Sequence, residues 1–368
     1  MFGIHKKYLE SFKSYILGIK KGDNIAIMYH TDCDGICSCL IIKKTIAHLL
    51  GKDSFIFTQK QGKIAVIPAT VELLKKKKIT KFIAVDMAVD EDEEPIREIE
   101  KFADILIIDH HIKKADLSSG KTVFIKAQDY ESSIDSSKYP ASKLCFDLAT
   151  PMIEGGGSRR LINDLKFISS IGISGDAGYD FWAQKKFLAK NDKEKIQKID
   201  HIISSYISIK GKFNSIVRIL EEDNIEQKIN KRIVENKDIS QYYFDIQKEL
   251  ERLILEIDHK ARFLKDRKGN IKLVFYSIQS RYNIKSILAN KISFEDFPTS
   301  TVVVEKNGGF SARNQTFKIS MNDMVKTATK GIEGAGGGGH IPAAGGYVPK
   351  ENVEEFFKNV VEYIERRV

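Results

Sequence analysis

The chain has 368 residues, of which 42% are hydrophobic and 30% charged, a balance typical of folded globular domains and unlike that of disordered chains. No apolar run is long enough to cross a bilayer, and the N-terminal sequence lacks the apolar core and cleavage site of a signal peptide. We therefore expect a cytoplasmic protein. The formal net charge of +9 suits a polyanionic partner such as nucleic acid, although Lys- and Ile-rich proteomes also contain basic proteins without one.

The first half of the chain alternates short apolar segments with helical stretches. An amphipathic helix is expected within residues 1–21, and buried strands over residues 24–29, 81–85 and 104–108. Near-continuous Ile, Val and Leu strands separated by helices predict a doubly wound, mainly parallel sheet, here assigned to residues 1–182. Sites in such sheets form at the carboxyl ends of the strands.

The second half divides into a helical connector and a smaller α/β domain. Residues 183–267 have helical period and heavy charge, which predicts connecting helices with solvated faces. For residues 268–368 we expect strands over 271–278 and 301–305, a hairpin over 309–320 that turns at Asn314 and Gln315, and a closing helix. The whole is predicted to be an α/β protein with an active-site cleft between its two domains.

The first chemical motif is His30-Thr-Asp32-Cys-Asp34-Gly35, directly after a buried strand. Side chains at alternate positions of an extended segment share a face, so His30, Asp32 and Asp34 can converge. Gly35 permits a sharp turn into the next helix. The alternative is an Asp-rich helix N-cap without a metal, but capping requires one acid and not three ligands.

Two further strands end in acidic residues. Asp86 follows the second strand, where an N-cap or Asx-turn is an equally good interpretation. An acidic run follows, which we interpret as a solvated helix start with Pro95 in its first turn; it comprises Asp90, Glu91, Asp92, Glu93 and Glu94.

The third strand ends at Asp109, His110 and His111. This triplet offers a metal ligand, a carboxylate that supports the ligand, and a substrate contact. Asp176, after an apolar helical run, is a weak candidate when taken alone.

In the C-terminal domain, a glycine-rich loop is predicted at residues 336–340. Consecutive glycines expose backbone N–H groups and allow an anion to approach closely. A flexible linker would look similar, but the strand-like sequence that follows favours a functional loop. It comprises Gly336, Gly337, Gly338, Gly339 and His340.

The four cysteines predict no zinc site. Cys33, Cys37 and Cys39 are separated by four and then two positions, unlike paired CxxC ligands, and Cys145 stands apart. By contrast, the oxygen and imidazole groups at the strand ends suit Mn²⁺ or Mg²⁺, with the histidines favouring Mn²⁺. They exceed the needs of one ion and suit two ions roughly 3.5–4 Å apart.

The order of these motifs resembles the DHH phosphoesterase family over nearly the whole chain. HTDCDG resembles its first motif, the Asp86 strand end its second, DHH its third, residues 172–176 its fourth, and GGGGH the signature of the DHH-associated C-terminal domain. HTDCDG, FSARNQ and the compact length are most similar to archaeal RecJ-like proteins. Bacterial RecJ usually begins its first motif with Asp and carries an additional nucleic-acid-binding domain.

The resemblance implies a role for each motif residue. His30, Asp32 and Asp86 would hold one metal ion, and Asp34, Asp86, His110 and Asp176 the other, with Asp86 bridging the two ions. Asp109 would orient the site, and His111 would contact the scissile phosphate. Arg313 and the 336–340 loop would bind a neighbouring phosphate or the terminal nucleotide, and Ser142 would line the same cleft.

The function so predicted is a two-metal exonuclease acting on single-stranded DNA or RNA. One alternative is an enzyme for small substrates: an oligoribonuclease, a nucleotide-bisphosphate phosphatase or a cyclic-dinucleotide phosphodiesterase. Another is a replication or repair protein that binds a helicase or replisome subunit and retains nuclease activity. The charged helices over residues 183–267 favour a longer substrate or a protein partner.

Overall fold

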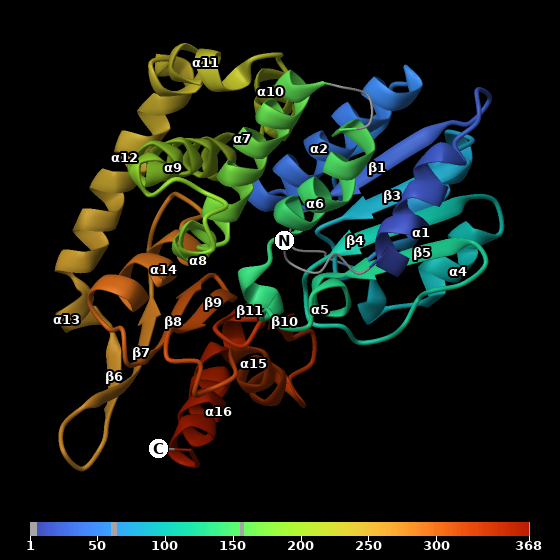
Figure 1. Ribbon diagram of the computed structural model, residues 1–368. Coiled ribbons are helices and arrows are strands. Elements are labelled where there is room, and N and C mark those ends of the chain that lie inside the picture. The colour runs from blue at the N-terminus through green and yellow to red at the C-terminus, as the bar shows by residue number, and fades with distance from the viewer. Residues whose placement is uncertain (1–5, 60–64, 155–157, 368) are drawn as a thin grey trace. The chain divides into compact units, whose positions relative to one another are not determined.

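Five parallel strands form the sheet of the N-terminal part, in the order β2-β1-β3-β4-β5 (Figure 1). The predicted parallel sheet is therefore confirmed, and two further strands, β2 and β5, add to the three that the sequence indicates. The strands are β1 (Ile25–Tyr29), β2 (Phe55–Phe57), β3 (Lys81–Val85), β4 (Asp104–Asp109) and β5 (Thr122–Lys126).

The computed structural model describes residues 6–59, 65–154 and 158–367. The first residues of the expected N-terminal helix lie outside these ranges, and α1 covers Lys6–Leu17. Contacts divide the chain into two units, Met1–Gln241 and Tyr242–Val368, here called unit 1 and unit 2. This single division falls inside the segment expected to connect the domains.

Helices cover both faces of the unit 1 sheet, and its strands are therefore buried on both sides. Ala26, Phe82 and Ile105 pack with α3 (Pro68–Lys76) and α4 (Glu94–Glu100) in one core cluster. The alternate side chains, including Ile27 and Ile83, are equally buried and face the other side. There α2 (Cys33–Leu50) contacts β1, and α6 (Ala141–Glu154) contacts β4.

The rest of unit 1 is helical, as the charge and period of the sequence indicate. Helix α7 packs against α2, α6 and α9. The α-helices of this part are α7 (Arg159–Gly175), α8 (Tyr179–Gln184), α9 (Lys193–Lys210), α10 (Phe213–Leu220), α11 (Ile225–Ile229) and α12 (Lys237–Leu255), the last of which continues into unit 2. Short helical turns are η1 (Val89–Glu91), α5 (Ala127–Tyr130), η2 (Ser136–Lys138), η3 (Lys190–Asp192) and η4 (Asn230–Val234).

Unit 2 contains a mixed six-stranded sheet in the order β10-β11-β9-β8-β7-β6, in which only the β7–β8 pair is parallel. Its core lies between the sheet and the helices α15 and α16, where Phe310 stacks on Phe356. The strands are β6 (Arg262–Lys265), β7 (Ile271–Ser277), β8 (Thr301–Lys306), β9 (Gly309–Asn314), β10 (Gly336–Gly339) and β11 (Ala343–Tyr347). The helices are α13 (Ile257–Lys260), α14 (Lys285–Glu295), α15 (Met321–Thr329), η5 (Lys350–Asn352) and α16 (Val353–Glu365).

The expected hairpin at Asn314 and Gln315 is wrong. The hairpin joins β8 to β9 instead, with Lys306 paired to Gly309 and a two-residue turn at Asn307 and Gly308. Both turn residues have positive φ, 53° and 86°. Asn-Gly is the pair that such a tight turn favours, because its backbone matches the twist of the two strands.

The predicted glycine-rich loop is a strand. Residues Gly336–Gly339 form β10 and pair antiparallel with β11. A Cβ on Gly337 would lie 2.4 Å from the Gly345 carbonyl oxygen and 2.7 Å from Val325, so only glycine permits this close packing. No helix within the described ranges is long and apolar enough to span a membrane.

Candidate metal centre

The ends of three neighbouring strands bring acidic and imidazole side chains together in unit 1. β1 leads to His30, β3 to Asp86 and β4 to Asp109, and these three strands lie side by side in the sheet. The carboxyl ends of parallel strands share one edge, so residues distant in sequence meet there. Two groups of side chains result, each with ligand atoms within 4.8 Å of one another.

The first group contains His30, Asp32 and Asp86. His30 Nδ1 lies 2.7 Å from Asp32 Oδ2 and 3.8 Å from Asp86 Oδ2. Asp32 is also the N-cap of α2, because its Oδ1 accepts a hydrogen bond from the Gly35 N–H at 3.0 Å. The capping interpretation is thus confirmed for Asp32, and the other oxygen of the same carboxylate points toward His30.

The second group contains Asp34, His110 and Asp176. His110 Nε2 lies 3.2 Å from Asp176 Oδ2 and 3.9 Å from Asp34 Oδ2. Asp34 is in the first turn of α2, His110 follows β4, and Asp176 is the C-cap of α7. His110 and Asp34 are buried, whereas Asp176 is a quarter exposed and lies at the open side of the group.

Asp86 lies between the two groups. Its Oδ1 is 3.3 Å from His110 Nε2 and its Oδ2 is 3.8 Å from His30 Nδ1. The residue is buried and has a φ of 56°, a left-handed conformation that is uncommon outside glycine and recurs at functional sites. Oδ1 accepts no hydrogen bond from the described residues. A buried carboxylate oxygen left in this state fits a cation.

The electrostatics of the site also fit bound cations. Burial and the Asp34 and Asp32 carboxylates raise the pKa of Asp86 well above its usual value. Burial raises the pKa of Asp176 to about 7. Burial opposes charge on His30, but the Asp32 carboxylate raises the pKa of that imidazole to about 10. Several carboxylates crowded together in this way need positive charge, which protons or divalent ions supply.

Asp109 has a different environment from the other carboxylates. Its Oδ1 accepts hydrogen bonds from the His110 N–H at 2.8 Å, the His111 N–H at 3.2 Å and His111 Nδ1 at 2.8 Å. Its Oδ2 accepts from Lys126 Nζ at 2.5 Å. Although Asp109, Asp86 and His111 are close enough to form a ligand set, four donors already occupy the Asp109 oxygens. The Asp109 carboxylate is therefore held in place by four donors beside the two ligand groups.

Sequence reasoning missed two residues of this network, Lys126 and Asp90. Lys126 ends β5, a strand that the sequence pattern does not indicate, and Asp90 belongs to an acidic run whose pattern predicts a solvated helix start. That interpretation is wrong for Asp90, which is buried against Lys126, and holds for the four exposed acids after it. Helix α4 begins at Glu94 with Pro95 in its first turn, as expected.

Ser142 does not reach an open cleft. Its side chain is fully buried at the start of α6. Its backbone N–H donates to Asp34 Oδ1 at 2.9 Å, and the Ala141 N–H donates to Asp34 Oδ2 at 2.7 Å. The expected substrate contact is therefore corrected: this segment holds Asp34 through the N–H groups at the start of a helix.

The four cysteines are buried and free, as small apolar side chains would be.

In unit 2, the residues expected to bind substrate lie at one end of the sheet. Arg313 in β9 pairs with Ala343 in β11, and the β10–β11 connection contains His340. The Arg313 guanidinium donates to Asn290 Oδ1 and to the Ala312 and Ala344 carbonyl oxygens. These bonds fix its orientation. Arg313 and His340 are thus positioned together, and Gly336–Gly339 contributes a closely packed strand.

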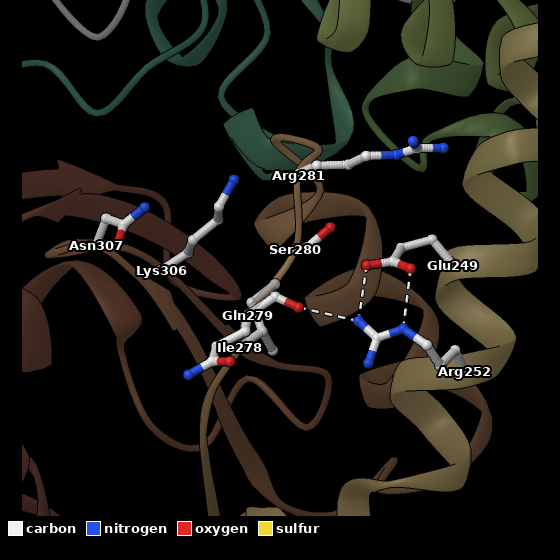
Figure 2. A pocket seen from close by; sticks show the side chains of 8 residues that line it. All are labelled: Glu249, Arg252, Ile278, Gln279, Ser280, Arg281, Lys306 and Asn307. Atoms are coloured by element: carbon white, nitrogen blue, oxygen red, sulfur yellow. Dashed lines mark hydrogen bonds and ion pairs between the residues drawn. The ribbon is translucent and has the colours of Figure 1, made fainter.

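Unit 2 also contains a basic pocket of about 670 Å³. Figure 2 shows the Arg252 guanidinium bonded to Glu249 and to the Gln279 carbonyl, whereas no dashed line joins Arg281 or Lys306 to another pocket residue. Arg281 is exposed and lies against the Tyr282 ring. Because Glu249 neutralises Arg252, the other two cations give this pocket a net positive charge. Its lining residues are Glu249, Arg252, Ile278, Gln279, Ser280, Arg281, Lys306 and Asn307.

Family models match both parts of the chain. Residues 24–168 match the N-terminal domain of the DHH family, and residues 270–366 match the DHHA1 domain. These two segments contain all the residues of the two ligand groups except Asp176, together with Arg313 and His340. No curated protein is similar enough in sequence to count as a match.

Solved structures share the fold at low sequence identity. RecJ from Thermus thermophilus in complex with Mn²⁺ has a TM-score of 0.71 and 16% identity, over 100% of this chain and 56% of that one. An exonuclease RecJ bound to manganese has a TM-score of 0.67 and 16% identity, over 98% and 94%. An exopolyphosphatase-related protein from Bacteroides fragilis has a TM-score of 0.56 and 15% identity, over 100% and 99%.

Proposed function

Because this chain belongs to the DHH family of phosphoesterases and carries the DHHA1 domain, we propose that it is a two-metal exonuclease acting on single-stranded DNA or RNA. The observation that carries the proposal is the pair of ligand groups on either side of Asp86. A buried carboxylate with one oxygen toward each group suits a bridge between two divalent ions.

The roles proposed for the metal ligands follow the two groups. His30, Asp32 and Asp86 would hold one ion, and Asp34, Asp86, His110 and Asp176 the other. When bound, two divalent cations would activate a water nucleophile and neutralise charge on the phosphate. Oxygen and imidazole ligands without thiolates suit Mn²⁺. Mg²⁺ would favour a site with fewer imidazole ligands than this one. Similar RecJ structures contain Mn²⁺ in two cases and Mg²⁺ in a third, which supports a site for divalent ions.

Residues of the chain itself would position the phosphate. The His111 Nδ1 atom is bonded to Asp109, which directs the other ring nitrogen, Nε2, away from that carboxylate. From there Nε2 would donate to the scissile phosphate and stabilise the charge that develops on it. Asp34 is held by two backbone N–H groups, so its carboxylate need not reorganise during the reaction.

Unit 2 would supply the substrate contacts beyond the metals. Arg313 would contribute the positive charge of its guanidinium to a phosphate, in an orientation set by its bonds to Asn290, Ala312 and Ala344. His340 lies at the same end of the sheet. The Arg281 and Lys306 side chains at the basic pocket would bind further phosphates of a strand, which favours a substrate longer than a dinucleotide.

A second candidate is an enzyme for short substrates. The structural likeness to an exopolyphosphatase-related protein supports it, because that fold covers this whole chain and nearly all of the other. An oligoribonuclease, a nucleotide-bisphosphate phosphatase or a cyclic-dinucleotide phosphodiesterase would use the same metal site. Such an enzyme would gain nothing from the basic pocket.

The experiment compares substrates that differ in length and label. Single-stranded DNA and RNA, each labelled in turn at the 5′ and 3′ end, are incubated with the protein and Mn²⁺ or Mg²⁺ beside a matching dinucleotide. We expect stepwise shortening of the long strand, faster with Mn²⁺. Preferential cleavage of the dinucleotide would select the second candidate.

Two variants test the site assignment in the same assay. His110→Ala removes a ligand and should reduce cleavage by at least about 10²–10³-fold, the size of losing one transition-state stabiliser. Asp109→Ala should reduce it by about 10–100-fold, as the loss of a carboxylate that orients ligands does. Full activity in both variants would show that the site lies elsewhere.

A further inference from the structure

A lysine is completely buried beside the proposed site. Lys126, at the end of β5, has no exposed side-chain surface, and neither have its partners Asp90 and Asp109. Its Nζ donates to Asp109 Oδ2 at 2.5 Å, to Asp90 Oδ1 at 2.8 Å and to the His111 carbonyl at 3.2 Å. Three donors thus meet three acceptors, which is the full capacity of an ammonium group.

Such a group is costly to bury. Burial opposes its charge, but the Asp109 and Asp90 carboxylates raise the pKa of Lys126 above its ordinary value, so it stays charged. A buried ion pair seldom stabilises a fold more than apolar side chains of the same size would. The Asp90–Lys126–Asp109 network therefore needs a reason other than stability, and the geometry of Asp109 supplies one.

Lys126 restricts the Asp109 carboxylate to one orientation. With Oδ2 bound to Lys126, Oδ1 faces the backbone N–H groups of His110 and His111 and the His111 ring. Rotation of the carboxylate would break the bond to the ammonium group. The position of the His111 imidazole therefore depends on a lysine that it does not contact through its own ring.

Asp90 fixes the lysine in turn. It lies in η1, after β3, and its second oxygen accepts the Lys114 N–H at 2.7 Å. The segment that follows β3 is thereby tied to the segment that follows β4, through a lysine at the end of β5. All three strands contribute to holding one carboxylate still.

From this geometry we infer that Lys126 is a positioning residue, which orients His111 toward the scissile phosphate through Asp109. The inference rests on the proposed function for the role of His111 and adds Lys126 and Asp90 to the machinery. It assigns no metal contact to either residue. It predicts that the effect of Lys126 on turnover passes through the His111 imidazole, the one ring that the described hydrogen bonds join to Asp109, since the other two bonds to Oδ1 come from backbone N–H groups.

A double-mutant cycle tests that dependence. Lys126→Met, His111→Gln and the double variant are compared for cleavage of a labelled single strand with Mn²⁺. Lys126→Met should lower kcat by about 10–100-fold with a smaller change in KM. In the His111→Gln background the same substitution should have no further effect on kcat, since the residue it positions is gone. Equal losses in both backgrounds would overturn the inference.

Stability requires its own control, because Lys126→Met leaves two buried carboxylates facing each other. Asp90→Asn/Lys126→Met removes one of those charges and should recover thermal stability without recovering kcat. Recovery of both together would mean that Lys126 acts only by stabilising unit 1. Asp90→Asn alone keeps the Lys126–Asp109 bond and should lower kcat less than Lys126→Met.

A spectroscopic measurement separates this inference from the proposed function. In the metal-free protein labelled with ¹⁵N-histidine, the His111 Nδ1–H bonded to Asp109 should give a downfield, slowly exchanging proton, identified by its loss in His111→Gln. We expect the signal to weaken or shift upfield in Asp90→Asn/Lys126→Met. An unchanged signal would refute the positioning role, whatever reaction the protein catalyses.

Discussion

Unit 1 contains a cluster of buried charged side chains, whereas the charged side chains at the unit 2 pocket are more exposed. In unit 1, Asp109, Lys126 and His110 are buried, and neighbouring groups hold each of them in one orientation. In unit 2, Arg281 is exposed and Lys306 half-buried, at the edge of an open pocket. Charges in low dielectric interact strongly, whereas exposed charges are screened by water and salt.

Under the proposed function, this difference separates catalysis in unit 1 from substrate binding in unit 2. A fixed cluster of ligands can stabilise a transition state because it does not reorganise during the reaction. Exposed cations can bind the phosphates of a flexible polyanion in many arrangements. Binding releases the counterions of those phosphates, which gives affinity although no single arrangement is fixed. Substitutions in unit 1 should therefore change turnover and metal binding, and substitutions at the unit 2 pocket should change the salt dependence of binding.

The largest effect is expected for Asp86→Asn. Asparagine tolerates the left-handed backbone at this position but loses the charge shared by both ligand groups. Without metal, the variant should be at least as stable as the parent, because burial and neighbouring carboxylates already disfavour the Asp86 charge. Saturating Mn²⁺ should stabilise the parent by about 2.7 kcal/mol at 100 times its Kd and the variant hardly at all. Thermal unfolding with and without Mn²⁺ measures both.

An intermediate effect is expected in unit 2 for Gly337→Ala. Its Cβ would meet the Gly345 carbonyl at 2.4 Å and Gly346 Cα at 2.9 Å, so β10 and β11 must separate. We expect a loss of about 1–3 kcal/mol in the free energy of unfolding, as for other overpacked sites. Gly336→Ala is the matched control, because its Cβ would have nothing within 4 Å. Equal unfolding midpoints in denaturant for the two variants would contradict the close packing.

A smaller effect is expected at the basic pocket. Arg281→Ala should weaken binding of a single strand and reduce the slope of log K against log salt by about 0.7, the value for one phosphate contact. Its thermal stability should not change, since the side chain is exposed. Lys350→Ala is the control, an exposed cation of unit 2 outside the pocket. Fluorescence anisotropy at several salt concentrations gives both slopes, and identical slopes would remove the pocket from the substrate path.

The smallest effect is expected for Asp200→Asn, a buried charge of unit 1 outside the metal centre. Burial raises the pKa of Asp200, which accepts hydrogen bonds from Ser174 and Ser204. A raised carboxyl pKa in the folded state favours folding at low pH, and this contribution is lost as pH rises through that pKa. The variant should therefore gain stability relative to the parent as pH rises, by less than about 1 kcal/mol. Paired melting curves across pH measure it, and a gain toward low pH would reverse the sign.

The parallel sheet and the grouping of its strand ends could be predicted from sequence. The strands β3 and β4 contain continuous apolar runs over residues 82–85 and 105–108, and each run is followed at once by an aspartate. Because parallel strands end at one edge, the motif order alone indicates that His30, Asp86 and His110 converge. At these positions the local sequence pattern and the sheet topology both place the side chains at the same edge of the sheet.

Other features could not be read from the pattern. The strand β5 carries Lys126, and a lysine at the end of a short apolar run indicates an exposed residue unless its partners are known. Asp90 belongs to an acidic run whose other members are exposed. The Asn307-Gly308 turn, by contrast, was available in the sequence, since Asn-Gly between apolar runs is a strong hairpin signal.

The sequence by itself therefore determined which histidines and acidic residues meet at the strand ends, because strand periodicity and motif spacing are local properties of the chain. Only the tertiary structure decided how Asp109 and Asp86 differ. Four donors surround the first, whereas the second keeps a buried oxygen without one, between two groups of ligands. Three of the four donors belong to the neighbouring His110 and His111, and the fourth is the Lys126 ammonium group. Lys126 and its partner Asp90 lie 17 and 19 residues from Asp109 in the chain, so this fourth bond forms only after the sheet has brought them together.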